Sequence, residues 1–275
     1  MKLAVSNIAW EPTQDAAVAD LLRREGVAGV EIAPTKWRER PFDSSSGEVA
    51  SYRRMWEDRG LPIVAVQSLL FGRPDLQLFG DETTRAAMLD YLRRVIEMSA
   101  ALGAHALVFG SPRNRQRAPL SAAQAQDIAI PFFRAIGDHA RGHGVAFCIE
   151  ANPPAYGCDF ITTTADAVAF CRAVDDAAIQ LNGDLGGMTV ADEDVQVTLR
   201  SAAPFLAHFH ASEPNLAELG AAADHEAAAA ALEVVGYAGW VSIEMRAGSD
   251  AGGPENIAAV ERAVRRAKGA YGRLG

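Results

Sequence analysis

No part of the chain has the hydrophobic run of about 20 residues that a membrane-spanning helix needs. The first residues, Met1 to Pro12, reach a charge and a proline too early for the apolar segment of a signal peptide, and their pattern is typical of a first strand. We therefore expect a cytoplasmic protein without a membrane partner.

Cysteine is also scarce. The chain has three, in no CxxC or zinc-finger spacing: Cys148, Cys158 and Cys171. An odd number in this arrangement indicates the reduced thiols of a cytosolic protein and not a disulfide framework.

Positive charge is in the minority, because 26 Lys and Arg residues face 35 Asp and Glu residues, for a formal net charge of -9. An acidic protein repels phosphate backbones, so we do not expect nucleic acid as a partner. A local basic pocket for a small anion is still compatible with this charge. What the sequence does contain is apolar material: 49% of its residues are hydrophobic and 22% are charged, which is typical of a globular protein with one sizeable core.

Short β-rich runs alternate with longer helical patterns along the whole chain. The segment 82–102 is the clearest helix, because Met88, Leu92 and Val95 begin an apolar stripe at three- and four-residue spacing. Pro131 should kink or divide a helix expected at 121–143. Strands are expected at 3–9, 29–33, 61–69, 105–110, 145–150, 179–184, 205–210 and 239–244, and further helices at 13–25, before Gly60, and at 164–174, 192–202, 223–235 and 254–268.

Eight strands alternating with eight helices, without a linker, predict a parallel sheet closed into a single-domain (β/α)8 TIM barrel over residues 1–275. The structural competitor is an open doubly wound sheet, which often carries a glycine-rich phosphate turn after its first strand. Here the first strand runs into Asn-Ile-Ala-Trp-Glu-Pro at 7–12, which contains no glycine.

Polar side chains end the last four expected strands: Glu150, Asp184, His210 and Glu244. In a barrel the C-terminal strand ends build the functional face, and neighbouring strands about 4.8 Å apart can aim their side chains at one ion. Each residue alone would be an ordinary acid or a hydrogen-bonded histidine. Three carboxylates gathered together, however, repel one another unless a cation joins them. Oxygen-rich ligation with one imidazole indicates one divalent metal ion, Mn2+ in the first place, with Mg2+, Co2+ and Zn2+ as alternatives.

The same strand ends resemble a known family. The run Cys148 to Pro153, the later Asp184, the pattern His208-Phe209-His210 and the closing Ser242 to Met245 are similar to the sugar isomerase/epimerase superfamily, the xylose isomerase-like TIM barrels. This group includes D-tagatose 3-epimerase and endonuclease IV relatives. The four ligand positions are separated by 34, 26 and 34 residues, nearly the ketose 3-epimerase pattern.

The resemblance implies that Glu150, Asp184, His210 and Glu244 bind the metal and that Glu150 and Glu244 are also the catalytic acid/base pair. One glutamate would remove the proton next to a substrate carbonyl, and the other would reprotonate the resulting enediolate on the opposite face, with the metal stabilising the oxyanion. The expected activity is a metal-dependent isomerase or epimerase of a sugar, sugar phosphate or keto-sugar.

Three positions depart from the ketose 3-epimerase pattern. A histidine three residues after the aspartate is replaced by Gly187, an arginine six residues after the metal histidine by Leu216, and a glutamate six residues after Glu150 by Tyr156. The metal ligands are retained while the sugar-recognition residues have changed, which argues against a free-ketose 3-epimerase.

Other residues near the same face are candidates for contact with a small carbohydrate substrate. A loop after the fourth strand carries two arginines suited to a carboxylate or phosphate, or simply to solvent. A histidine two residues before His210 should point the same way and support the site. The candidate substrate-binding residues are Arg113, Arg115, Tyr156, His208, Glu213, Glu31 and Gln67.

Several alternatives remain open from the sequence. A metal-dependent lyase or dehydratase would use the same four ligands. An endonuclease IV-like nuclease is disfavoured, because that chemistry needs many histidines and the chain has six, together with its negative charge. A barrel that binds a carbohydrate without converting it, and assembly into a homo-oligomer, are also left open.

Overall fold

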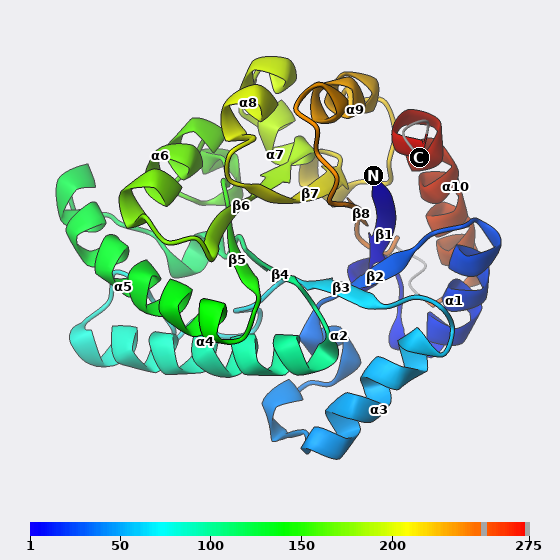
Figure 1. The fold of residues 1–275 in the computed structure, drawn as a ribbon, viewed down its shortest axis with the longest axis horizontal. Helices are drawn as coiled ribbons and strands as arrows, with labels where there is room; N and C mark the ends of the chain where they lie inside the picture. Colours follow the sequence, from blue (N-terminus) through cyan, green and yellow to red (C-terminus); the bar gives the residue numbers. More distant parts are fainter. Residues whose placement is uncertain (249–251, 273–275) are drawn as a thin grey trace.

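The computed structural model describes residues 1–248 and 252–272. Eight parallel strands form a closed barrel in chain order, and β8 pairs with β1 to complete it (Figure 1). The predicted (β/α)8 barrel is therefore confirmed. The strands are β1 (Lys2–Ser6), β2 (Gly29–Ile32), β3 (Ile63–Val66), β4 (Ala106–Phe109), β5 (Ala146–Glu150), β6 (Ile179–Asp184), β7 (Leu206–Ser212) and β8 (Trp240–Glu244).

The helices surround the barrel (Figure 1). They are α1 (Asp15–Arg24), α2 (Pro34–Trp37), α3 (Ser46–Glu57), α4 (Glu82–Leu102), α5 (Ala122–Gly142), α6 (Thr164–Val174), α7 (Leu185–Val190), α8 (Val195–Ala202), α9 (His225–Val234) and α10 (Pro254–Tyr271). Pro131 lies inside α5, which is not divided there.

Local sequence sets where the helices begin and end. The hydroxyls of Ser45 and Ser121 accept hydrogen bonds from the N–H groups three residues on, at 3.3 Å in both cases. These side chains satisfy N–H groups that the first helical turn leaves unpaired. At the end of α4, Gly103 adopts a φ of +88°, in the left-handed region that glycine tolerates best.

The structure differs from the sequence expectation at several strand ends. The seventh strand, expected to end at His210, continues to Ser212. The first strand stops at Ser6, because residues 7–9 form a 3-10 turn. The third strand stops at Val66, and Ser68 has a φ of +55°, which is incompatible with an extended strand. Two short helices were not predicted, α2 and α7. The second begins directly after Asp184, whose side chain caps it by accepting a hydrogen bond from Gly187 N.

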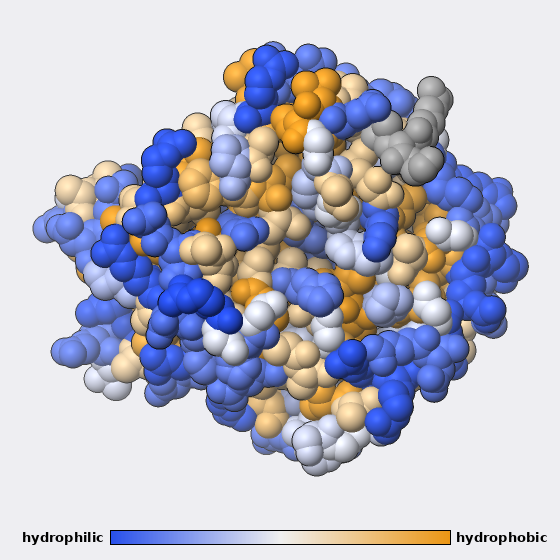
Figure 2. Space-filling view, in the orientation of Figure 1, coloured by the Kyte–Doolittle hydropathy of each residue, from blue (hydrophilic) through white to orange (hydrophobic). Residues whose placement is uncertain are grey.

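The strands of the barrel are largely buried. Every residue of β2, β3 and β4 is buried, as expected for parallel strands covered by helices. Hydrophilic side chains gather over the outer helices, and more hydrophobic ones lie nearer the centre of the face in Figure 2. Among the described residues, no helix is both long enough and apolar enough to cross a membrane.

Candidate metal centre

The ends of β5, β6, β7 and β8 bring four predicted ligands together. The Nδ1 atom of His210 lies 3.5 Å from Glu150 Oε2, 3.9 Å from Asp184 Oδ2 and 3.2 Å from Glu244 Oε2. The histidine side chain is fully buried, whereas the three carboxylate side chains keep 10–13% of their surface exposed. The imidazole therefore forms the floor of the cluster, and the carboxylates have an opening to solvent.

The unpartnered atoms of this cluster fit a divalent cation. His210 Nδ1 is buried and makes no hydrogen bond within the described part of the chain, a costly state for a polar atom. Three possible ligand atoms, one carboxylate oxygen each from Glu150 and Asp184 and one ring nitrogen of His210, all lie within 4.8 Å of one another. Three carboxylates and one imidazole are a donor set for Mn2+, Co2+, Mg2+ or Zn2+.

The electrostatics of the cluster lead to the same conclusion. Burial, together with the charges of Glu150 and Glu244, raises the pKa of Asp184 from its ordinary 3.8 to about 7. Burial alone would lower the pKa of His210, but the carboxylates of Glu31 and Glu244 outweigh it and hold that pKa well above 6.5. The cluster thus has an excess of negative charge that a cation would neutralise.

Two asparagines fix the carboxylate of Glu150. Asn152 Nδ2 donates to Oε1 and Asn182 Nδ2 donates to Oε2, both at 2.8 Å. Arg115 is also buried, and its Nη2 donates to the backbone oxygen of Glu150 at 2.7 Å. At Gly110, directly after β4, a Cβ atom would lie 2.6 Å from Glu150 Oε1, so only glycine leaves room for this carboxylate in its present position.

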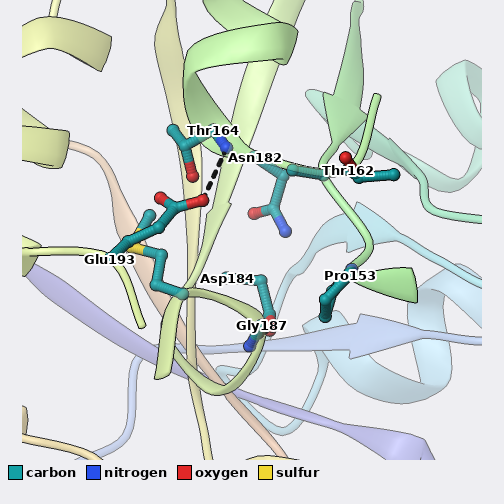
Figure 3. Close-up of a pocket in the computed structure, with 9 residues that line it drawn as sticks. Pro153, Thr162, Thr164, Asn182, Asp184, Gly187 and Glu193 are labelled. Carbon is teal, nitrogen blue, oxygen red and sulfur yellow. Dashed lines mark hydrogen bonds between the residues drawn. The ribbon is translucent and has the colours of Figure 1, made fainter. Parts of the chain in front are cut away.

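Asp184 is held equally firmly. Ser212 Oγ donates to its Oδ2 at 2.6 Å, and Gly187 N donates to its Oδ1 at 2.5 Å. A small pocket adjoins this side of the cluster, where Asp184 and Gly187 lie close together (Figure 3). Across that pocket Glu193 accepts a hydrogen bond from Thr164 N at 2.8 Å, which ties the loop after α7 to the start of α6.

A fourth carboxylate lies beneath the histidine. Glu31, the next-to-last residue of β2, is fully buried, and its Oε1 is 3.0 Å from His210 Nε2. Its Oε2 accepts a hydrogen bond from Ser242 Oγ and lies 3.6 Å from His208 Nε2. The rings of His208 and His210 both contact Glu31, in agreement with the expectation that the two side chains point the same way.

The remaining predicted substrate-binding residues lie in different surroundings. Arg113 is exposed, and the amide of Gln67 is buried, donating to Ser6 Oγ at 2.7 Å. Tyr156 is half-buried, and its hydroxyl accepts from Asn215 N at 3.0 Å, which links the loops after β5 and β7. Glu213 is 2% exposed, and its carboxylate accepts from Gly220 N and Ala223 N at 2.8 Å, so it organises the loop before α9.

Sequence reasoning missed four residues that shape the cluster: Asn152, Asn182, Ser212 and Gly110. Strand alternation could have indicated two of them, because Asn182 and Ser212 are each two residues from a predicted ligand on the same strand and therefore share its face. Nothing in the sequence marks Gly110, since its role depends on a carboxylate from the next strand.

Comparison with known proteins identifies the family. The sequence model of the xylose isomerase-like TIM barrel matches residues 19–268. The chain belongs to this family. None of the curated proteins matches it.

Solved structures with the same fold cover nearly the whole chain. A D-psicose 3-epimerase determined in the presence of D-fructose is 20% identical, with a TM-score of 0.81 over 99% of this chain and 100% of that one. The 3-keto-D-glucoside 4-epimerase of E. coli is 19% identical, with a TM-score of 0.76 over 97% and 99%. An IolI protein with a bound zinc atom is 18% identical, with a TM-score of 0.74 over 100% and 99%. At these identities the likeness establishes the fold.

Proposed function

We propose that the protein is a metal-dependent isomerase or epimerase of a sugar or sugar derivative, with Glu150 and Glu244 as the proton-transfer pair. One observation carries this proposal: two partly exposed glutamates, on strands β5 and β8, lie 3.5 Å and 3.2 Å from the same buried nitrogen of His210. Two of the similar structures are sugar epimerases and a third holds zinc, which supports the proposal.

The proposed metal ligands are Glu150, Asp184, His210 and Glu244. A divalent ion bound by them would act as a Lewis acid that polarises a substrate carbonyl and so makes the adjacent C–H more acidic. Mn2+ is the proposed ion, with Mg2+, Co2+ and Zn2+ as alternatives.

The two glutamates would move the proton. Because β6 and β7 separate their strands, Glu150 and Glu244 approach the cluster from different directions. A proton removed by one carboxylate and a proton returned by the other would invert the carbon between them, whereas its return to the neighbouring carbon would exchange aldose and ketose. Asn152 and Asn182 hold Glu150 in one orientation, which a positioned base requires.

Glu31 takes a supporting role in this proposal. It is wholly buried and both its oxygens face protein side chains, so it would orient His210 and would not touch substrate. Tyr156 and the exposed Arg113 remain the proposed substrate contacts from the loops. A tyrosine hydroxyl in place of the glutamate of ketose 3-epimerases, and Gly187 in place of a histidine, favour a substrate other than a free ketose.

The test is hydrogen exchange in D2O. Metal-free protein would be reloaded with Mn2+ for assays and with diamagnetic Mg2+ or Zn2+ for NMR, and incubated with ketohexoses, ketose phosphates and keto-glycosides. We expect metal-dependent deuterium incorporation next to a carbonyl, with an epimer or isomer as product. Loss of water from the substrate would assign the site to a dehydratase instead.

The matched controls are Glu150→Gln, which should abolish exchange or confine it to one face of the substrate, and Glu233→Gln, an exposed glutamate of α9, which should retain it. The absence of exchange across the whole panel, in protein that holds a full complement of metal, would contradict the proposed function.

A further inference from the structure

A second cluster of metal-ligand side chains lies on the outside of the barrel. Glu97 belongs to α4, His139 belongs to α5, and His143 is the residue that ends α5. Helices α4 and α5 pack against each other (Figure 1). One ligand atom from each of these three residues lies within 4.8 Å of the other two.

Two close contacts hold the side chains of this cluster together. His139 Nε2 lies 3.2 Å from Glu97 Oε1, and the rings of His139 and His143 have their centroids 4.7 Å apart. The Nε2 atom is itself buried, yet it makes no hydrogen bond of acceptable geometry within residues 1–248 and 252–272. A buried ring nitrogen beside a carboxylate and a second imidazole is arranged as a metal ligand would be.

The spacing of the two histidines suits one ion. Residues four apart on a helix lie on the same face, and two histidines at this spacing are a known means of holding zinc. Two imidazoles and one carboxylate complete three positions of a tetrahedral zinc site, with water in the fourth. This nitrogen-rich donor set prefers Zn2+ over the hard cations Mg2+ and Ca2+.

The cluster lies towards the opposite end of β5 from the candidate metal centre. Helix α5 ends at Gly142 and β5 begins at Ala146, so the last turn of α5 is near the start of β5, whereas Glu150 is at its end. This end of a TIM barrel is associated with stability, and the catalytic loops lie at the other.

We propose that Glu97, His139 and His143 form a second metal site, which binds Zn2+ and joins α4 to α5. The site is independent of the proposed catalytic centre. An ion held by both helices binds the folded chain and not the unfolded one, so it stabilises the fold by mass action.

The experiment separates the two sites by variants of the full chain. Metal-free wild type, Asp184→Ala, His143→Gln and the double variant Asp184→Ala/His143→Gln would be titrated with Zn2+ by calorimetry, and with Co2+ by visible absorption. If both sites bind, wild type takes two ions, each single variant takes one, and the double variant takes none at the same concentration. Loss of a residue that only hydrogen-bonds a metal ligand costs about 10- to 100-fold in metal affinity. Loss of the direct ligand His143 should therefore cost at least as much.

Two further readouts guard against misfolding and against general histidine binding. Zn2+ should raise the Tm of Asp184→Ala and not that of the double variant. As a matched control, His105→Gln removes an exposed histidine outside the cluster. This variant should still bind two Zn2+ ions, as wild type does.

The outcomes keep this proposal distinct from the catalytic one. Equal Zn2+ stoichiometry and affinity in Asp184→Ala and in the double variant would overturn the second site. If instead wild type and Asp184→Ala both bound one ion, and His143→Gln removed it, the second site would stand and the catalytic metal centre would fail.

Discussion

His210 Nε2 lies 3.0 Å from Glu31 Oε1, and both side chains are fully buried. A carboxylate at this nitrogen favours a proton on Nε2 and leaves Nδ1 directed at Glu150, Asp184 and Glu244. The pair joins β2 to β7 across the barrel. It fixes which nitrogen of the ring is available to a metal ion.

Replacement of Glu31 tests this relationship. Glu31→Gln keeps the shape of the side chain and removes its charge, so His210 should lose basicity while the fold is retained. We expect the affinity of the cluster for Mn2+ to fall about 10- to 100-fold, with most of the rate restored at saturating metal. Metal titrations of activity would measure this, with Glu233→Gln as the control. Unchanged metal affinity would show that Glu31 has only a packing role.

Gly110 offers a test of how closely Glu150 must be positioned. In Gly110→Ala the new Cβ would stand 2.6 Å from Glu150 Oε1 and displace that carboxylate. A misplacement of this kind can cost about 100-fold in rate, so we expect at least that loss in kcat with an unchanged circular dichroism spectrum. Gly142→Ala is the control, because a Cβ there meets nothing within 4 Å. If both variants were equally active, Glu150 would not need its present position.

The buried His225, which contacts Glu213, should make the stability of the fold depend on pH. His225 contacts Glu213 Oε1 at 3.2 Å and Tyr271 Oη at 2.9 Å. Burial lowers the pKa of His225 below its ordinary 6.5, although Glu213 opposes the shift. His225 therefore takes up a proton at a higher pH in the unfolded chain than in the folded one. Its contribution to the free energy of unfolding is fully present above pH 6.5, its ordinary pKa, and is lost as the pH falls below that value.

The comparison with His225→Gln isolates this effect from other titrating groups. The difference in free energy of unfolding between wild type and variant should shrink between about pH 7.5 and about pH 5.5. Urea denaturation at several pH values measures it. A difference that stayed constant, or grew on acidification, would mean that His225 is stabilised in its charged form.

The sequence carries enough information to predict the barrel and the clustering of the four proposed ligands. Apolar periodicity separates helices from strands, and the position of Glu150, Asp184 and Glu244 at the last residue of β5, β6 and β8 places them on one face. These are local patterns, so one chain is sufficient to recognise them. The short helix α7 escaped prediction because its start depends on the side chain of Asp184 as a cap.

Contacts across the barrel could not be predicted in the same way. Glu31 and His210 are 179 residues apart and meet only because the sheet closes. The sequence alone shows Glu31 as an acid in a buried strand without a partner, and so predicts a substrate contact for it. The same holds for Glu213, whose carboxylate accepts backbone N–H groups of a loop that has no regular pattern.

The proposed roles of the glutamates and the aspartate can be separated by kinetics. Glu244→Gln keeps an oxygen that can ligate weakly but removes the base. We expect it to retain much of its metal and substrate affinity, while kcat falls by about 10²–10⁴-fold, the usual contribution of a positioned general base. Exchange of the substrate proton with solvent should be lost, or should persist on one face only, where Glu150 still works.

Asp184→Asn is the contrasting variant, because Asp184 is held by Ser212 and Gly187 and is proposed to be only a ligand. Its metal affinity should fall, and added Mn2+ should restore part of its rate. Both variants would be assayed across a range of Mn2+ concentrations, with bound metal measured in parallel. Turnover at the wild-type rate by metal-saturated Glu244→Gln would reduce Glu244 to a ligand, and the two-base mechanism would then be wrong.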